Sequence, residues 1–569
     1  MIFTKIYSRQ SIFFILFALL TSNLAAQKSY PKDYFRSPID FKIQIAGNFG
    51  ELRSNHFHTG LDILTEGVVG KKVYAIADGY VSRINISGGG YGNALYVTHP
   101  NGYVSVFGHL KTFNKKISAF LDSVQHAKQQ FAMNLYPLPG QFPVKKGDVI
   151  AFAGNSGRSS GPHIHFEIRD RETEEPINPF LFGIGVEDDV QPKIFSITRY
   201  SFSDTINWDS FSKIKYKNIN GKTIKANGNT GFGIEMFDYT TGRHNTNGVY
   251  NLKLRIDDTL YFESQFDRLS FYTNRYINSY IDYGERISTR KKIIKCFIEP
   301  NNRLNNYLIR NKNGIFDFND GKTHDIKITA TDFYGNKKSV SFRVKADSTY
   351  KKQKPTVSKH FKQQLFYQKE NYFEADGLKI SFHRNSLLYD LAFRYYATNP
   401  RSKTYSKIHH IHKESTPLFN KITIALKVDS TALWLKEKLL IARLTKDGKY
   451  QAEGGKLIDN YLITKINSFG NFVVVADTLK PVIKPVYYKK KLVSSGKTLR
   501  VKIYDNLSGI KEYKGYIDGK WVLFKYDAKY HLLKCNLLKE GIKAGKHKLK
   551  LKVDDYCGNG AIFTSAFLM

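Results

Sequence analysis

Residues 154–168 read Gly-Asn-Ser-Gly-Arg-Ser-Ser-Gly-Pro-His-Ile-His-Phe-Glu-Ile, a glycine- and serine-rich turn followed by an alternating run. Alternation of this kind predicts a β-strand. Because successive side chains of a strand point to opposite faces, His163 and His165 are expected on one face, and Ile164 and Phe166 on the other, in a core. Such a histidine pair alone is more often a surface or packed pair than a metal site.

Two further histidine motifs precede this strand. His-Thr-Gly-Leu-Asp occupies residues 58–62, and Phe-Gly-His-Leu occupies residues 107–110. Imidazole and carboxylate ligands suit Zn²⁺, and catalytic zinc sites use three protein ligands and leave a position for water. Additional histidines can move the water's proton or stabilise an oxyanion. Together the motifs predict a zinc hydrolase site built from five side chains: His58, Asp62, His109, His163 and His165.

Residues 27–185 are expected to form one mainly β domain. Short alternating runs are separated by turn signals such as Asn101-Gly102. One segment interrupts the pattern, since helical spacing predicts an amphipathic helix over about residues 115–133. The apolar positions that carry this prediction are Ile117, Phe120, Leu121, Val124 and Phe131.

The order of the motifs, H-x-G-x-D, then G-H-L, then G-N-S-G-x-S-S-G-P-H-I-H-F-E, resembles the lysostaphin-type (LytM-like) zinc metallopeptidases, which cleave peptides in peptidoglycan. The resemblance covers about residues 45–183. It implies a compact antiparallel β fold (a duplicated hybrid motif) with the site in an open groove. It also implies one Zn²⁺ per chain and peptidoglycan peptides as substrate.

The same resemblance assigns roles residue by residue. It implies zinc ligation by His58, Asp62 and His165, and catalytic roles for His109 and His163. The chain departs from the family's pattern in the long stretch 112–143, where many relatives have a short loop. An inserted helix in this stretch could wall the groove.

The first 26 residues indicate the compartment. Lys5 and Arg9 precede the apolar run Ser11–Leu20, and small residues end in Ala25-Ala26. This pattern predicts a signal peptide over residues 1–26. The run is half of the roughly 20 residues that a membrane span needs, and no later stretch is long enough. We therefore expect an exported protein that stays in the periplasm or at the cell envelope, with secretion as the alternative. Nucleic acid is not expected as a partner.

Residues 186–569 again look strand-rich and show signs of duplication. Asp188-x3-Pro192-x-Ile194 recurs as an Asp-x3-Pro-x-Ile segment at residues 477–483. An alternating strand followed by a Gly-Asn turn, ending at residue 336, recurs with its turn ending at residue 559.

These repeats predict two related β-sandwich (Ig-like) modules over residues 186–347 and 478–569, the first with an insertion. Between them, residues 355–477 form a strand-rich module, for which a β-sandwich is also expected. The predicted fold class is mainly β throughout.

Positive charge is concentrated in these later modules. The whole chain carries a formal net charge of +37, whereas residues 27–185 hold 17 basic and 13 acidic residues. A basic surface in an exported protein suggests anionic envelope polymers as partners. Three hypotheses remain: a zinc endopeptidase, a non-catalytic peptidoglycan-binding regulator of another wall hydrolase, and a structural or adhesion protein.

Four residues keep alternative interpretations. His56 is interpreted as a neighbour of the site and not a ligand, because three ligands already fill a catalytic zinc site. Glu167 either orients a ligand or forms a plain surface salt link. Cys535 and Cys557 could pair in an oxidising compartment, which the sequence leaves open.

Overall fold

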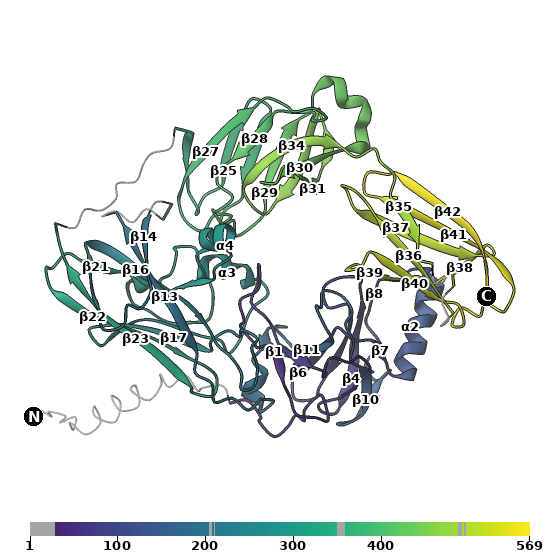
Figure 1. The fold of residues 1–569 in the computed structure, drawn as a ribbon, viewed down its shortest axis with the longest axis horizontal. Helices are drawn as coiled ribbons and strands as arrows, with labels where there is room; N and C mark the ends of the chain where they lie inside the picture. Colours follow the sequence, from purple (N-terminus) through teal and green to yellow (C-terminus); the bar gives the residue numbers. More distant parts are fainter. Residues whose placement is uncertain (1–28, 204–207, 210, 350–358, 488–491, 494–496) are drawn as a thin grey trace, which may run out of the picture.

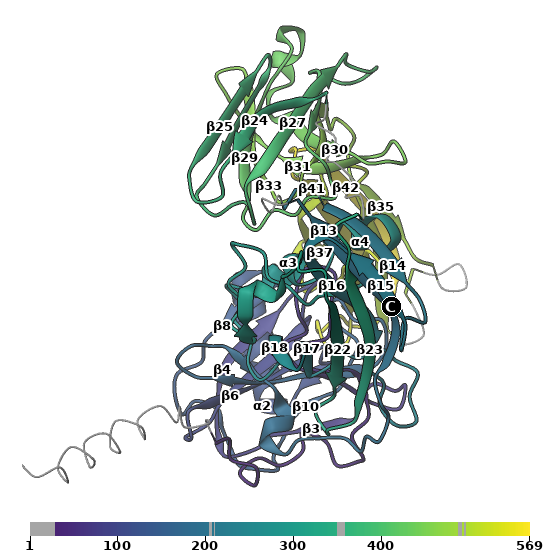
Figure 2. The ribbon, with the colours of Figure 1, turned by 90° about the vertical axis from the view of Figure 1, so that its left-hand side faces the viewer.

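The computed structural model describes residues 29–203, 208–209, 211–349, 359–487, 492–493 and 497–569. The predicted signal peptide lies outside these residues. Four β-rich bodies follow one another in a ring, and the last returns to lie against the first (Figure 1). Seen from the side, the body of residues 359–477 stands above the others (Figure 2).

The first domain consists of short strands. They are β1 (Ile45–Gly47), β2 (Leu61–Leu64), β3 (Lys72–Tyr74), β4 (Gly79–Ile86), β5 (Asn93–Thr98), β6 (Tyr103–Gly108), β7 (Thr112–Phe113), β8 (Met133–Leu135), β9 (Pro143–Val144), β10 (Val149–Phe152), β11 (His163–Asp170) and β12 (Pro176–Ile177), followed by the 3-10 helix η1 (Pro179–Phe182). A large sheet has the order β1-β2-β11-β6-β5-β4-β8, with β9 beside β4 and β12 beside β11, and a small sheet has the order β3-β10-β7. Ile164 and Phe166 of β11 are fully buried, as their alternation predicts.

The predicted helix is present as α2 (Lys115–Lys128). Asn114 caps its start by accepting a hydrogen bond from the backbone of Ile117, and it ends where Gln129 adopts a left-handed conformation, so it is shorter than expected. Ile117 and Leu121 face the domain core. The opposite side lies against the last module, not over the histidine-bearing strands (Figure 1).

The first module after this domain is built from two sheets. Its elements are β13 (Lys193–Phe202), β14 (Phe211–Tyr216), β15 (Thr223–Ala226), β16 (Gly228–Phe237), β17 (Asn251–Ile256), β18 (Thr259–Gln265), β19 (Ile293–Lys295), β20 (Tyr307–Arg310), η3 (Asn311–Gly314), β21 (Phe316–Phe318), β22 (Thr323–Thr331) and β23 (Lys337–Ala346). One sheet has the order β14-β13-β16-β19 with β21 beside β16, and the other β15-β23-β22-β17-β18-β20. The insertion between β18 and β19 carries η2 (Asn274–Tyr276), α3 (Ile277–Tyr280) and α4 (Tyr283–Thr289).

The next body, the middle module, also has two sheets, ordered β24-β27-β28-β34-β30-β31 and β25-β26-β29-β33-β32. Its elements are β24 (Phe361–Leu365), β25 (Asn371–Ala375), β26 (Leu378–Phe382), β27 (Leu391–Thr398), β28 (Ile408–Ile411), β29 (Ile422–Lys427), η4 (Ser430–Lys438), β30 (Leu439–Leu444), β31 (Tyr450–Gly454), β32 (Lys456–Ile458), β33 (Tyr461–Ile466) and β34 (Gly470–Ala476).

The last module pairs the sheet β35-β36-β40-β39 with the sheet β38-β37-β41-β42. Its strands are β35 (Val482–Pro485), β36 (Thr498–Tyr504), β37 (Ile510–Ile517), β38 (Lys520–Val522), β39 (Lys525–Asp527), β40 (Leu532–Asn536), β41 (Lys546–Asp555) and β42 (Gly560–Leu568). The mainly β, antiparallel fold class predicted from the sequence is confirmed.

One hydrophobic core crosses the boundary expected at residue 185. It joins apolar residues of the first and middle modules and also takes in Phe49, Leu52 and Phe57 from the first domain. The segment just before His58 therefore packs into the core of the modules that follow. The first domain and the first module share their packing at this boundary.

The three cysteines are all buried and unpaired. Cys535 packs in the core of the last module, whereas Cys557 lies in a separate cluster with Leu440 and Val473 of the middle module. The two thiols left open by the sequence thus form no disulfide. Among the described residues, no helix has the length and apolarity to cross a bilayer.

Candidate metal centre

Three of the predicted side chains meet at the start of β2. Strands β2 and β11 are antiparallel neighbours, with Asp62 opposite His165 in the register. His58 lies one short turn before β2, where Gly60 permits a close approach, since a Cβ there would lie 2.2 Å from the carbonyl oxygen of Phe166. His58 Nε2, Asp62 Oδ1 and His165 Nδ1 are each 3.0 Å from the other two.

Hydrogen bonds on the far side of each ring fix the tautomers. His58 Nδ1 donates to the carbonyl oxygen of Asn48 at 2.8 Å, and His165 Nε2 donates to Glu167 Oε1 at 2.7 Å. The remaining nitrogens, which face Asp62, are the ones free to bind a metal, and they would do so as neutral imidazoles. Without an ion, burial opposes the charge of His165, but its hydrogen bonds with Asp62 and Glu167 raise the pKa of this ring to about 9.

The donor set fits zinc. Ligand atoms about 2.0–2.1 Å from a tetrahedral Zn²⁺ lie about 3.3 Å apart, close to the spacing here. Burial alone would raise the pKa of Asp62, but the surrounding histidines, above all His58, hold that pKa well below its usual range. The carboxyl is therefore ionised, and two imidazole nitrogens and one carboxylate oxygen form the group.

The other two histidines stand beside this group. His109 follows β6 with a φ of 60°, and its Nδ1 donates to the carbonyl oxygen of Ser156 at 2.8 Å. Burial, followed by the neighbouring His165, lowers the pKa of His109 to about 3, so this ring is neutral near neutral pH and its Nε2 carries a lone pair. The ring centroids of His109 and His163 are 4.7 Å apart. His163 Nε2 lies 3.5 Å from Asp62 Oδ1.

Glu167 is fully buried, which excludes a surface salt link. One of its oxygens accepts from His165, from Thr59 Oγ1 at 2.6 Å and from Tyr91 OH at 2.5 Å, and the other accepts from Arg169 Nε at 2.6 Å. Burial opposes its charge, but Arg169 and His165 hold the pKa of Glu167 well below its usual range. Of the two roles considered for Glu167, its position therefore fits the one in which it orients His165.

Sequence reasoning missed Arg53 and Glu51. Arg53 Nη2 pairs with Asp62 Oδ2 at 2.7 Å and with Glu51 Oε2 at 2.8 Å. The guanidinium thus holds one oxygen of Asp62 and leaves the other toward the two histidines. No local pattern signals this contact. His56, by contrast, is exposed and is outside the ligand group, as expected.

The first module holds the segment that carries His58. Asn48 Nδ2 donates to Gly248 O at 2.7 Å, and Gly248 N donates back to Asn48 Oδ1 at 2.9 Å. Phe57 N donates to Asn274 Oδ1 at 2.5 Å. Because the carbonyl oxygen of Asn48 also accepts the hydrogen bond from His58 Nδ1, the position of this histidine depends on contacts with a different module.

The last module contacts the loop before β11. Lys529 Nζ donates to Asn155 O at 2.5 Å, to Asn155 Oδ1 at 2.9 Å and to Ser159 O at 3.0 Å. Ser159 Oγ in turn lies 3.1 Å from His163 Nδ1. The ring of modules therefore closes on the loop that supports His163.

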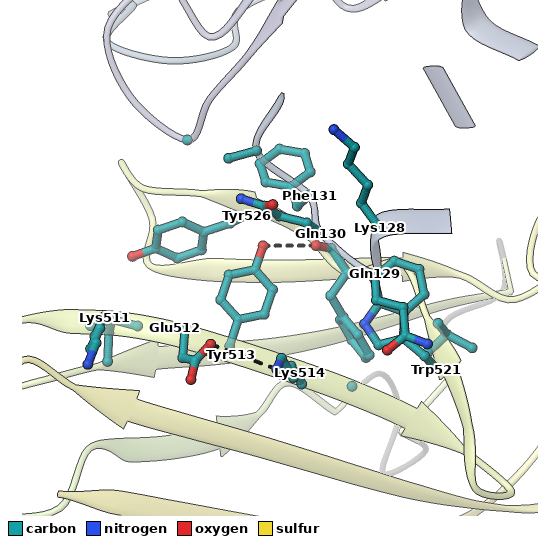
Figure 3. Close-up of a pocket in the computed structure, with 16 residues that line it drawn as sticks. Lys128, Gln129, Gln130, Phe131, Lys511, Glu512, Tyr513, Lys514, Trp521 and Tyr526 are labelled. Carbon is teal, nitrogen blue, oxygen red and sulfur yellow. Dashed lines mark hydrogen bonds and ion pairs between the residues drawn. The ribbon is translucent and has the colours of Figure 1, made fainter. Parts of the chain in front are cut away.

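A cavity of about 450 Å³ lies farther along the same interface, where Gln129, Gln130 and Phe131 face Tyr513 and Trp521 (Figure 3). His126 of α2 donates to Glu540 Oε2 at 3.1 Å at this contact.

The fold and this centre together define a lysostaphin-type domain. The sequence profile of Peptidase family M23 matches residues 56–129 and 134–179, so this part of the chain is a domain of that family, and the resemblance seen in the sequence is confirmed. A second profile, of a Zu5-like domain, matches residues 362–477, the middle module.

Curated relatives match the same region. The DD-carboxypeptidase/endopeptidase Mpg of Neisseria meningitidis serogroup B is 33% identical over 128 residues, which is 22% of this chain and 23% of that protein. The peptidoglycan DD-endopeptidase ShyC of Vibrio cholerae is 27% identical over 146 residues, 25% of this chain and 28% of that protein. The murein hydrolase activator NlpD of Salmonella dublin is 30% identical over 154 residues, 27% and 32% of the two chains.

The chain thus matches only about a quarter of the length of the first of these relatives. Among solved structures, the catalytic domain of lysostaphin from Staphylococcus simulans is 21% identical and covers 27% of this chain and 93% of its own, with a TM-score of 0.17.

Proposed function

We propose that the protein is an exported zinc-dependent endopeptidase that hydrolyses peptide bonds in peptidoglycan stem or cross-bridge peptides. The observation that carries the proposal is the convergence of three ligand atoms, each 3.0 Å from the others, beside two more buried histidines. The M23 domain and the cell-wall hydrolases among its relatives support the substrate class. The same relatives support an envelope location.

In this proposal His58, Asp62 and His165 hold the ion. Zinc, when bound, supplies a Lewis acid that polarises the substrate carbonyl and makes water a nucleophile near neutral pH. His109 accepts the water's proton at Nε2, because its Nδ1–H is held by Ser156. His163 donates from Nδ1 to the carbonyl oxygen of Gly161 at 2.9 Å, and its Nε2 lies 3.5 Å from Asp62 Oδ1. With a proton on both nitrogens, this ring stabilises the developing oxyanion through Nε2–H.

The test is muropeptide digestion. Purified protein loaded with zinc should release cleaved stem or cross-bridge peptides from sacculi, and mass spectrometry of the products identifies the bond. A chelator should abolish release and added zinc should restore it. Release that survives complete metal removal contradicts the proposal.

A second candidate is a non-catalytic regulator of another wall hydrolase. The similarity to the murein hydrolase activator NlpD favours it, as does the burial of all five site residues, each at most 9% exposed. Stoichiometric zinc without cleavage of any muropeptide, together with activation of an added hydrolase, would support this candidate over the first.

We also propose that the last module binds anionic envelope polymers. Strand β41 exposes Lys546, Lys548, Lys550 and Lys552 on one face, because alternate residues of a strand share a face. Replacing Lys550 and Lys552 with Gln should weaken sacculus binding several-fold at low salt and hardly at all at high salt, where ion screening removes the attraction.

Co-sedimentation with sacculi across a salt series measures this effect. Lys115 and Lys116, exposed on α2, give a control pair with the same loss of charge. Equal weakening by both pairs would mean that β41 has no specific role.

A further inference from the structure

Two groups of three aspartates lie where the chain enters the first and the last modules. Asp188, Asp238 and Asp332 each place a carboxylate oxygen within 4.8 Å of the other two. Asp188 follows η1, in the connection from the first domain, whereas Asp238 and Asp332 directly follow strands β16 and β22. We call this the first acidic cluster.

The second acidic cluster consists of Asp477, Asp505 and Asp555, with the same spacing limit. Asp477 follows β34, the last strand of the middle module, and the other two directly follow β36 or end β41. Each cluster therefore joins an entering linker to two loops of a module. The duplicated sequence segments supply two aspartates of each cluster: the first of the Asp-x3-Pro-x-Ile segment (Asp188 or Asp477) and the one before the Gly-Asn turn (Asp332 or Asp555).

Each cluster is held by an asparagine in the equivalent position of its module. Asn336 donates from its backbone to Asp332 Oδ1 at 2.8 Å, and from its side chain to Asp332 Oδ2 at 2.7 Å and to Asp188 O at 3.1 Å. In the last module the corresponding distances are 2.7, 2.7 and 2.9 Å, from Asn559 to Asp555 and to Asp477 O. The two modules thus present their carboxylates in equivalent positions.

Two buried residues at the first cluster each have an oxygen that receives no hydrogen bond. Asp238 and Asn247 are each 3% exposed, and the Oδ1 atom of each has no hydrogen-bond partner among the described residues. Both residues line one cavity of about 10 Å³ with Asp188 and Asp332, which is room for a single ion or water. A buried carboxylate oxygen without a partner destabilises the fold unless a cation or donor satisfies it.

The second cluster also contains buried carboxylate oxygens without a hydrogen-bond donor. Asp477 is 1% exposed, and its Oδ1 and that of Asp505 have no hydrogen-bond partner within the described parts of the chain. None of the ion pairs between described residues uses any of the six carboxylates. In the first cluster, burial and then repulsion from Asp332 and Asp188 raise the pKa of Asp238 to about 8, as expected for a carboxyl that lacks a positive neighbour.

We propose that each acidic cluster binds one calcium ion and that the two ions fix the junctions at which the first and last modules are attached. Three carboxylates in each cluster, with the amide group of Asn247 beside the first, supply the oxygen ligands that calcium prefers. Calcium–oxygen bonds of about 2.4 Å allow ligand atoms up to about 4.8 Å apart. Zinc prefers the nitrogen-containing site at His58 and His165.

The clusters lie where bound ions would affect the position of His58 and of the last module. Asn48 lines the cavity of the first cluster, and its carbonyl oxygen orients His58. The second cluster sets the direction of the last module, whose Lys529 reaches the loop at Asn155. Calcium at the two junctions therefore holds the ring of modules in the arrangement of Figure 1.

Calorimetric titration of the chelator-treated, zinc-reloaded full chain with Ca²⁺ tests the inference. We expect two sites per chain and a rise of several degrees in Tm. Asp238→Asn and Asp505→Asn should each remove one site, and the double variant both. Without calcium, Asp238→Asn should leave Tm nearly equal, because a carboxyl with a pKa of about 8 is already largely uncharged near neutral pH, whereas with calcium its Tm should fall below that of the unchanged protein.

Asp317→Asn, at an exposed position on β21, is the matched control and should keep both sites. His165→Ala should also keep both, so the outcome is independent of the proposed peptidase activity. Fewer than two sites in the unchanged protein, two sites remaining in the double variant, or the same heat with Mg²⁺ would overturn the inference.

Discussion

Alanine in place of His165 is expected to abolish both zinc binding and peptide hydrolysis. His165 Nδ1 lies 3.0 Å from His58 Nε2 and from Asp62 Oδ1, so its removal leaves two ligands, too few to retain the ion. Loss of a group that only orients a ligand typically costs tenfold to a hundredfold in metal affinity, and loss of the ligand itself should exceed a hundredfold. Zinc content by elemental mass spectrometry and muropeptide release measure the two effects.

His56→Ala is the matched control. This histidine lies two residues before His58, is exposed and is outside the ligand group. Its variant should keep zinc and activity within about twofold, since an exposed substitution changes little. A His165→Ala protein that is folded by circular dichroism, retains one zinc per chain and still hydrolyses muropeptides would refute the proposed ligand set.

The histidine motifs were readable from sequence because each depends on local geometry. The period of two along β11 places His163 and His165 on one face, and the apolar spacing of α2 places Ile117 and Leu121 on the core side. These features require only the residues of one strand or helix.

Long-range contacts left no such pattern. The core that takes in Phe49 and Phe57 is made by modules more than a hundred residues away in the sequence. Nothing in the sequence therefore indicated that hydrophobic packing continues across residue 185. The ion pair between Arg53 and Asp62, and the contact of Lys529 with Asn155, likewise depend on how separate segments meet. Periodicity carries no information on such pairs.

Glutamine in place of Glu167 is expected to weaken zinc binding by about tenfold to a hundredfold. The buried carboxylate accepts from His165 Nε2 at 2.7 Å and so holds a proton on Nε2 and aims Nδ1 at the ligand group. The variant also leaves Arg169, 6% exposed, without its charged partner, which should lower the free energy of unfolding by about 3–5 kcal/mol. Zinc titration and urea unfolding measure the two losses separately.

The two expected effects distinguish positioning from ligation. If Glu167 acts through His165, excess zinc should restore most activity to folded Glu167→Gln, whereas it should not rescue His165→Ala. Glu172→Gln, an exposed glutamate after the same strand, should change neither zinc affinity nor stability appreciably. Unchanged zinc affinity in a destabilised Glu167→Gln protein would limit this carboxylate to pairing with Arg169, and the orientation of His165 would then rest on Tyr91, whose ring stacks on it at 4.8 Å.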